Sequence, residues 1–209
     1  MHSSSSFSAF DIVVVASSMG GFQALETFLA ALPSTFPAPV AIVQHVSPRS
    51  GSAMLRLFGR RAQLPVSYAE TGQVLEAGKV YVAPPDRHFL VTRARTALLT
   101  RTEKVKFCRP AADPLFVSAG AVYGARTLGV VLTGANTDGA GGAQAIKWSG
   151  GMVLAQDSAS CVAFGMPRAA IATGCVDLVL PMGSIGAAVV ALTMARGAAD
   201  FLRVPMLAA

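Results

Sequence analysis

Short, continuous apolar runs alternate along this chain with segments in which apolar residues recur every three or four positions. The first run occupies residues 12–16, and a second run at 40–43 ends in Gln44-His45. Apolar residues between these runs share one face of a predicted helix, namely Phe22, Leu25, Phe28 and Leu29. A strand, a helix and a strand in this order form a crossover that joins parallel strands. The beginning of the chain is therefore typical of a parallel sheet.

The alternation continues to the end of the chain. Further buried strands are predicted at 128–132, 152–155 and 178–180, and helices at 50–58, 114–123, 139–149 and from Ser184 onward. Brief apolar segments separated by Gly, Pro or charged residues favour hairpins at 66–69, 79–83, 89–91 and 97–99. Strands that are apolar throughout are covered on both faces, as in α/β proteins. We predict an α/β fold with a doubly wound, mostly parallel sheet flanked by helices, and a small antiparallel hairpin insertion.

Composition supports a folded domain. Of the 209 residues, 53% are hydrophobic and 13% are charged, which excludes a disordered chain, a collagen and a coiled coil. This length fits one compact domain with a sizeable core. We predict a disordered, Ser-rich leader at 1–10, a single folded domain at 11–195 and a C-terminal tail at 196–209.

The sequence shows no membrane span and no export signal. The stretch 178–195 has no charge, but Pro181, Gly183 and Gly186 divide it into a strand and a helix. Each piece is shorter than the ~20 residues that a span requires. The leader lacks Lys and Arg, unlike a signal peptide, and the three cysteines form no C-x-x-C pair. We therefore expect a cytoplasmic protein without membrane insertion, disulfide framework or zinc site.

The charge balance favours an acidic partner. Lys and Arg number 17 against 11 Asp and Glu, which gives a net charge of +6. Basic residues gather loosely between positions 87 and 106. Nucleic acid is not favoured, because helix-turn-helix spacing and RNA-binding aromatic motifs are absent. A solvated basic hairpin is the alternative interpretation of this cluster.

The residues that directly follow the apolar strands carry the candidate chemistry. In a doubly wound sheet, ligands bind outside the carboxyl ends of the strands. Ser18 follows the first strand, His45 follows the second, and Asp138 follows the strand at 128–132. A serine, a histidine and an aspartate supply a nucleophile, a general base and a carboxylate that orients the base. These three residues are therefore a candidate catalytic triad.

Glycines beside the serine give this turn a second interpretation. Gly20 and Gly21 permit a sharp turn at a helix N-terminus, where backbone amides near Met19 and Gly20 are candidate oxyanion donors. Alternatively, Ser17 and Ser18 cap the helix while the glycines bind phosphate. The dinucleotide spacing G-x-G-x-x-G and the P-loop lysine are absent, which disfavours a nucleotide site.

The other two residues also have structural alternatives. A histidine at a strand end is often a hydrogen-bonded structural residue, and Asp138-Gly139 alone favours a turn or a helix cap. His88 is a second candidate base, but it lies in a predicted turn between hairpin strands. The coincidence of three such residues at one sheet edge favours His45 as the base.

Six groups of residues follow one another in an order that is known from one enzyme family. They are Ala16-Ser17-Ser18-Met19-Gly20-Gly21, Gln44-His45, Ala83-Pro84-Pro85-Asp86-Arg87-His88, Arg109-Pro110 with Asp113, Leu132-Thr133-Gly134-Ala135-Asn136-Thr137-Asp138-Gly139, and Ala155-Gln156-Asp157 leading to Phe164-Gly165-Met166-Pro167-Arg168. In these motifs the chain resembles the catalytic domain of CheB-type chemotaxis methylesterases, from Ile12 to Leu192.

The resemblance implies a function and a set of site residues. Ser18, His45 and Asp138 match the family's triad, which removes methyl esters from glutamyl residues of chemoreceptor helices, releases methanol, and in some members deamidates receptor glutamines. It implies no metal and no cofactor, and methylated chemoreceptor helices as partners. Support for the oxyanion and the loop is expected from Met19, Gly20 and Ala135. Substrate contacts are expected from Asp86, His88, Met166, Pro167 and Arg168.

The chain also departs from the family pattern. Ser17-Ser18-Met19 stands where the family usually has Ala-Ser-Thr, and Ala135 stands where many members have Met. Only about ten residues precede the first strand, whereas a regulatory receiver domain needs on the order of 120, so we expect none and expect activity without a phosphodonor. The main alternative is a receptor-binding or scaffold protein that retains the fold without catalysis, and a nucleotide-binding protein is a more distant one.

Overall fold

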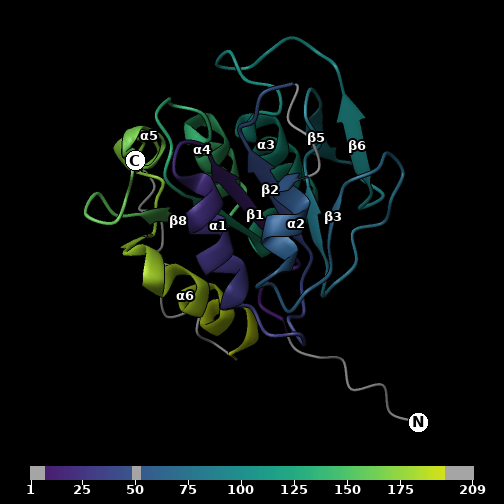
Figure 1. Ribbon diagram of the computed structural model, residues 1–209, viewed down its shortest axis with the longest axis horizontal. Helices are drawn as coiled ribbons and strands as arrows, with labels where there is room; N and C mark the ends of the chain where they lie inside the picture. Colours follow the sequence, from purple (N-terminus) through teal and green to yellow (C-terminus); the bar gives the residue numbers. More distant parts are fainter. Residues whose placement is uncertain (1–7, 49–52, 196–209) are drawn as a thin grey trace.

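The computed structural model describes residues 8–48 and 53–195, which form a seven-stranded sheet between two layers of helices (Figure 1). Every pairing between strands of this sheet is parallel. Across the sheet the strands are β3 (Val66–Tyr68), β4 (Val80–Val82), β2 (Val40–Gln44), β1 (Ile12–Ser17), β7 (Thr127–Val131), β8 (Met152–Gln156) and β9 (Leu178–Leu180). A separate antiparallel pair consists of β5 (His88–Val91) and β6 (Ala97–Thr100). The predicted fold class is therefore confirmed.

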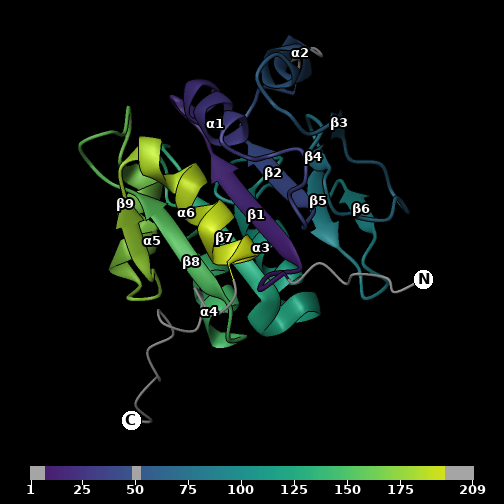
Figure 2. The same cartoon turned by 90° about the horizontal axis from the view of Figure 1, so that it is seen from below.

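Helices cover both faces of the sheet (Figure 2). One face is covered by α1 (Gly21–Ala30), α2 (Ala53–Gly59) and α6 (Met182–Met194). The other face is covered by α3 (Ala112–Tyr123), α4 (Ala140–Trp148) and α5 (Gly165–Ala172), with a short 3-10 helix η1 (Gly124–Arg126) after α3. The two layers give the sheet two separate hydrophobic cores.

The central strand shows why the apolar runs are unbroken. Val13 and Val15 of β1 point into the core below α1 and α6, whereas Val14 and Ala16 point into the core below α3. Successive strand residues face opposite sides, so a sheet covered on both faces needs apolar residues at every position. Full burial of a Val side chain contributes about 1.5–3 kcal/mol to folding, which gives β1 a large share of the stability.

Two of the predicted hairpin segments are instead parallel strands, so that prediction was wrong. β3 pairs with β4 in parallel, with Val66 opposite Val80, and β4 pairs with β2. α2 connects β2 to β3 as a crossover. Strands of three residues are too short to show a period in the sequence, so partner choice depended on tertiary packing. The hairpin prediction holds only for β5 and β6.

Helix starts also differ from the sequence prediction. α3 begins at Ala112 and α6 at Met182, two residues earlier than predicted in each case, and α5 was not predicted. Ser184 is therefore not the N-cap of the last helix, where Pro181 stands instead. The start of α3 has no capping side chain of its own, so the local sequence gives no signal for it.

The folded part begins earlier than the predicted leader allows. Phe10 is fully buried in the core under α1, and the amide of Ala9 donates to the carbonyl of Thr193 at 3.0 Å. Residues 1–7 and 196–209 of the predicted leader and tail lie outside the described residues. Within the described ranges, we find no helix with the length and apolar character needed to cross a bilayer.

The strand order locates a crevice at one sheet edge. The chain moves from β1 toward β2 and β4 on one side, and from β7 toward β8 and β9 on the other. The order therefore reverses between β1 and β7. The loops that follow β1 and β7 leave the carboxyl ends of these strands in opposite directions. In doubly wound proteins, ligands bind in the crevice between two such loops.

Candidate active site

The carboxyl ends of three neighbouring strands bring Ser18 and His45 together. The amide of His45 donates to the carbonyl of Ser17 at 3.0 Å, so His45 lies beside the end of β1. On the other side, the Ser18 amide donates to the carbonyl of Thr133 after β7 at 2.9 Å. The Gln44 side-chain amide donates to the carbonyl of Ser18 at 2.9 Å. Backbone pairing thus fixes the serine loop between β2 and β7.

The environment of the two serines separates their roles. Ser17 is fully buried, and its hydroxyl donates to Oε1 of Gln44 at 2.6 Å. Ser18 is half-buried, and its hydroxyl makes no hydrogen bond within the described part of the chain. A Cβ on Gly21 would lie 2.1 Å from the same Oε1 of Gln44, so only glycine fits there. Ser18 is therefore the serine whose hydroxyl is available for chemistry.

The turn after Ser18 leads directly into α1. Gly20 has a φ of 77°, in the left-handed region that glycine adopts without strain, and is the N-cap residue of the helix. The Gly21 amide closes the turn on the carbonyl of Ser18 at 2.9 Å. The amides of Met19 and Gly20 have no acceptor among the described residues. Unpaired amides at a helix N-terminus attract negative charge.

Met166 packs beneath the serine loop. A Cβ on Gly134 would lie 2.1 Å from the Met166 sulfur and 2.9 Å from Cβ of Ser18, so Gly134 permits this close packing. The Met166 side chain is fully buried, and its amide donates to the carbonyl of Gly134 at 2.8 Å. Met166 therefore supports the loop from below.

His45 and Asp138 form a direct pair. Nε2 of His45 lies 2.7 Å from Oδ2 of Asp138, and the imidazole is 9% exposed. A contact of this length with a carboxylate places the imidazole proton on Nε2 and leaves a lone pair on Nδ1. Nδ1 is therefore the nitrogen that is available to accept a proton.

Asp138 is held by four hydrogen bonds. Besides the bond from His45, its carboxylate accepts the amides of Ala112 at 2.5 Å, Asp113 at 3.0 Å and Gly139 at 3.0 Å. Burial by itself raises the pKa of Asp138. The hydrogen bonds from the imidazole and from the backbone amides outweigh burial and hold this pKa below its usual value. The carboxylate is thus ionised and fixed although it is fully buried.

Cys108 is a neighbour of His45 that the sequence did not indicate. Its sulfur lies 3.6 Å from Nδ1 of His45, and the side-chain amide of Asn136 donates to the sulfur at 3.4 Å. Burial raises the pKa of Cys108, and the charge of Asp138 acts in the same direction. The group beside the base is therefore a neutral thiol. Its only signal in the sequence is that it directly precedes the Arg109-Pro110 motif.

The residues predicted to contact substrate differ in position. His88 does not lie in a turn, as predicted, but begins β5 and is fully buried, with Nε2 3.0 Å from the carbonyl of Glu103. Asp86 accepts hydrogen bonds from Arg109 at 2.7 and 2.9 Å, which hold its pKa below the usual value. Pro167 is buried and Arg168 is exposed at the start of α5. Of the predicted substrate contacts, Arg168 is the most accessible.

Exposed apolar and basic side chains surround the serine and the base. Met19 is 57% exposed on the serine turn, and Phe107 is 96% exposed next to Cys108. Lys106, beside Phe107, donates to the hydroxyl of Thr137 at 3.0 Å. The basic cluster predicted at positions 87–106 is therefore spread over two parts of the fold. Its later members, Arg101, Lys104 and Lys106, belong to the loop from β6 to α3 beside the site. We call this segment, residues 101–108, the basic loop.

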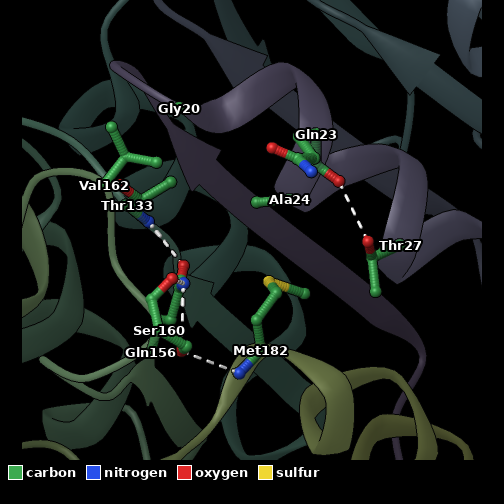
Figure 3. Close-up of a pocket in the computed structure, with 9 residues that line it drawn as sticks. All are labelled: Gly20, Gln23, Ala24, Thr27, Thr133, Gln156, Ser160, Val162 and Met182. Carbon is green, nitrogen blue, oxygen red and sulfur yellow. Dashed lines mark hydrogen bonds between the residues drawn. The ribbon is translucent and has the colours of Figure 1, made fainter.

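A cavity of about 200 Å³ adjoins the serine turn (Figure 3). Its lining comes from α1, from the ends of β7 and β8, and from the start of α6, and it carries no charged side chain. Gln156 accepts the amide of Thr133 at 2.9 Å and donates to the carbonyl of Ser160 at 2.8 Å, so these lining groups are already paired. The cavity includes Gly20 but not Ser18, His45 or Asp138. Within the described residues, we find no group of three or more His, Cys, Asp or Glu side chains suited to a metal ion.

A solved structure shares this architecture closely. The crystal structure of the Thermotoga maritima CheB methylesterase catalytic domain matches with a TM-score of 0.84 and 36% sequence identity. The match covers 88% of this chain and 98% of that domain.

Sequence relatives agree with the structural match. Protein-glutamate methylesterase/protein-glutamine glutaminase 2 of Anaeromyxobacter dehalogenans is 43% identical over 164 residues, and the enzyme so named from Pyrococcus horikoshii is 42% identical over 165. Each alignment covers 78% of this chain but 48% and 45% of those relatives, so the chain spans about half of their length. A relative from Leptospira interrogans, 39% identical over 162 residues, is covered over 84% of its length. Because residues 13–189 also match the CheB methylesterase family as a whole, the chain belongs to that family.

Proposed function

We propose that this protein is a serine hydrolase that removes methyl esters from glutamyl side chains of chemoreceptor-like proteins. The observation that carries the proposal is the pair between His45 and Asp138 beside the serine loop, to which the His45 amide is hydrogen-bonded through the carbonyl of Ser17. Nδ1 of His45 faces the Cys108 thiol at 3.6 Å, and the Ser18 hydroxyl has no hydrogen-bond partner among the described residues. The names of the relatives from Anaeromyxobacter and Pyrococcus support the substrate class. Ser18 is the proposed nucleophile, His45 the base, and Asp138 the residue that orients the base.

In the proposed acylation step, Nδ1 of His45 takes the proton of the Ser18 hydroxyl as its oxygen attacks the ester carbonyl. The imidazolium then gives this proton to the departing methoxide, so methanol leaves and an acyl-enzyme remains. Asp138 holds the ring and stabilises the imidazolium. Water attacks the acyl-enzyme in the second step, with His45 again as the base, and frees the glutamyl carboxylate.

The negative oxygen of the tetrahedral intermediate needs hydrogen-bond donors. The unpaired amides of Met19 and Gly20 are the proposed donors, because they lie next to the nucleophile at the N-terminus of α1. Ala135, which lies in the neighbouring loop after β7, is exposed and contributes backbone only. The same steps convert a glutamine to glutamate when the leaving group is ammonia, which matches the second activity in the relatives' names.

The surface around the site supports a helical, acidic substrate. Exposed Met19 and Phe107 offer apolar contact, and the basic loop and Arg168 offer positive charge. Methylated chemoreceptor helices carry glutamates, which positive charge beside the site would attract. We place the protein in the cytoplasm with these helices as its partners, and nucleic acid is not part of the proposal.

Release of methanol from a methylated receptor fragment tests the proposed function. The wild-type protein is expected to release methanol, and Ser18→Ala is expected to release none above background. A fluorophosphonate probe is expected to label the wild type and not Ser18→Ala. A protein that binds the fragment without labelling or methanol release would instead be the scaffold alternative.

A further inference from the structure

Two helices meet at the candidate site without capping residues of their own. The N-cap positions of α3 and α4 are occupied by Ala111 and Gly139, and neither makes a side-chain hydrogen bond. The first amides of a helix lack partners within the helix and need acceptors from elsewhere. In both helices, an aspartate associated with the other helix supplies them.

Asp138, which precedes α4, caps α3. Its Oδ2 accepts the amide of Ala112, and its Oδ1 accepts the amide of Asp113. Both donors are in the first turn of α3. The carboxylate that holds His45 is therefore also the cap of another helix.

Asp113, in the first turn of α3, caps α4 in return. Its Oδ1 accepts the amide of Gly139 at 3.0 Å and the amide of Gly142 at 2.7 Å. Gly139 directly follows Asp138 in the chain, so this bond fixes the backbone from which the Asp138 side chain projects. The two aspartates thus hold each other's helices, and α3 and α4 pack closely along their length.

We infer that Asp113 is a positioning residue for the proposed reaction, acting through the backbone of Gly139 to aim the Asp138 carboxylate at His45. This inference rests on the proposed function. Among the described residues Asp113 makes no hydrogen bond to the Ser18 loop, so its effect is expected to pass through Asp138 and its neighbours.

The energetics of Asp113 argue against a purely stabilising role. Burial raises the pKa of Asp113, and the charge of Asp138 raises it further, against the lowering effect of its bond from Gly142. A raised pKa means that folding disfavours the ionised form at neutral pH. A neutral asparagine would accept the same bonds through one oxygen without this cost. Asp113 therefore carries an unfavourable burial of its charge at a position next to the pair between His45 and Asp138.

Two substitutions separate geometry from charge. Asp113→Ala removes the acceptor of the Gly142 amide and one of the two acceptors of the Gly139 amide, the other being Asp138 itself. We expect kcat to fall by about 10- to 100-fold with KM changed by less than about twofold, because binding does not use this residue. Asp113→Asn keeps an acceptor oxygen, and kcat is expected to stay within about threefold of the wild type. Asp177→Asn is the matched control. Asp177 also accepts a backbone amide, that of Val153 at a distance of 2.8 Å, but it does not belong to the loops of the candidate site. It is expected to lower the melting temperature and leave kcat unchanged.

A double-mutant cycle tests the route through Asp138. Asp138→Asn alone is expected to remove most of the activity. Adding Asp113→Ala is then expected to lower kcat no further, because the residue through which Asp113 acts is already lost. Fully multiplicative effects would overturn the inference. So would an unchanged kcat in folded Asp113→Ala, or an Asp113→Asn variant as impaired as Asp113→Ala.

A spectroscopic measurement keeps this test separate from the proposed function. The proton between Nε2 of His45 and Asp138 gives a downfield proton NMR signal that does not require turnover. The signal is expected in the wild type and in Asp113→Asn, and is expected to be weakened or lost in Asp113→Ala. Its persistence in Asp113→Ala would overturn the inference even if the enzyme is inactive on every ester tested. Absence of esterase activity with the expected NMR pattern would overturn only the proposed function.

Discussion

The two sides of the candidate site are built in opposite ways. On the side of the base, the Asp138 carboxylate is fully buried and accepts four hydrogen bonds, three of them from backbone amides. On the side of the proposed nucleophile, the Ser18 hydroxyl and the neighbouring amides have no hydrogen-bond partner among the described residues, and Met19 is 57% exposed. The Asp138 carboxylate is therefore fixed before substrate binds, whereas the groups around Ser18 are open to gain partners from the substrate.

Each arrangement suits its task. A carboxylate that stabilises an imidazolium must keep its position through both chemical steps, and preformed hydrogen bonds remove the cost of reorganisation. Under the proposed function, the side of Ser18 must admit the side chain of another protein. Open donors and exposed apolar residues there gain partners only in the complex.

The largest effect is expected at the serine itself. Ser18→Ala is expected to lower kcat by roughly 10⁴-fold, as for loss of a triad serine. Ser17→Ala is the matched control, because Ser17 donates its hydroxyl to Gln44 and points into the core. It is expected to retain most activity and to lower stability by about 1 kcal/mol. Comparable kcat values for wild type and Ser18→Ala in a methanol-release assay would reject the assignment.

A large effect is also expected from modification of Cys108. Methyl methanethiosulfonate transfers a methylthio group to the thiol and releases methanesulfinate. The added group would occupy the space beside Nδ1 of His45, 3.6 Å away, and activity is expected to fall by at least tenfold. Burial raises the pKa of Cys108 and of Cys161, that of Cys161 to about 11, and Cys175 is buried, so mass spectrometry is needed to identify the thiol that has reacted.

The control for this modification is Cys108→Ser. Its activity after treatment, divided by its activity before treatment, is expected to stay near one. A thiol reductant is expected to restore the treated wild type. If mass spectrometry shows Cys108 modified while activity persists, the thiol does not border the working base.

A smaller effect is expected from the basic loop. Lys104→Gln combined with Lys106→Gln is expected to raise KM for an acidic receptor fragment by about three- to tenfold at low salt, with kcat nearly unchanged. Screening weakens this attraction, so wild type and variant are expected to converge as salt rises. Arg93→Gln removes an exposed charge outside this loop and serves as the control. Equal effects of both changes would assign the result to net charge alone.

The smallest expected effect concerns stability in acid. Hydrogen bonds hold the pKa of Asp138 below its usual value, so its ionised form stabilises the folded state above the unfolded-chain pKa of about 3.9. That contribution is lost as pH falls through the lower, folded-state pKa. The free energy of unfolding of the wild type is expected to decrease more steeply below about pH 4 than that of Asp138→Asn. Parallel curves in urea titrations would contradict the buried, ionised state of this carboxylate.

The candidate site was largely accessible from the sequence because of a topological rule. Ser18, His45 and Asp138 each directly follow an apolar strand, and parallel strands place their carboxyl ends at one edge. The sequence did not indicate Cys108 or the role of Asp113. Cys108 reaches His45 from a loop 63 residues away, and the partners of Asp113 lie 26 and 29 residues away in another helix. No local pattern encodes contacts of that kind.

The sequence by itself determined the layers of the fold, because a strand covered on both faces must be apolar at every position. It also indicated which strand ends carry the candidate site residues. Tertiary structure alone decided that β3 and β4 join the parallel sheet, that Phe10 belongs to the core, and which of two adjacent serines is free. In each case the deciding interaction is with a residue distant in the chain. For β3 and β4 it is strand pairing, for Phe10 it is burial in the core, and for Ser17 it is the hydrogen bond to Gln44. Such energies depend on the assembled fold, whereas periodicity and strand ends depend only on residues next to one another.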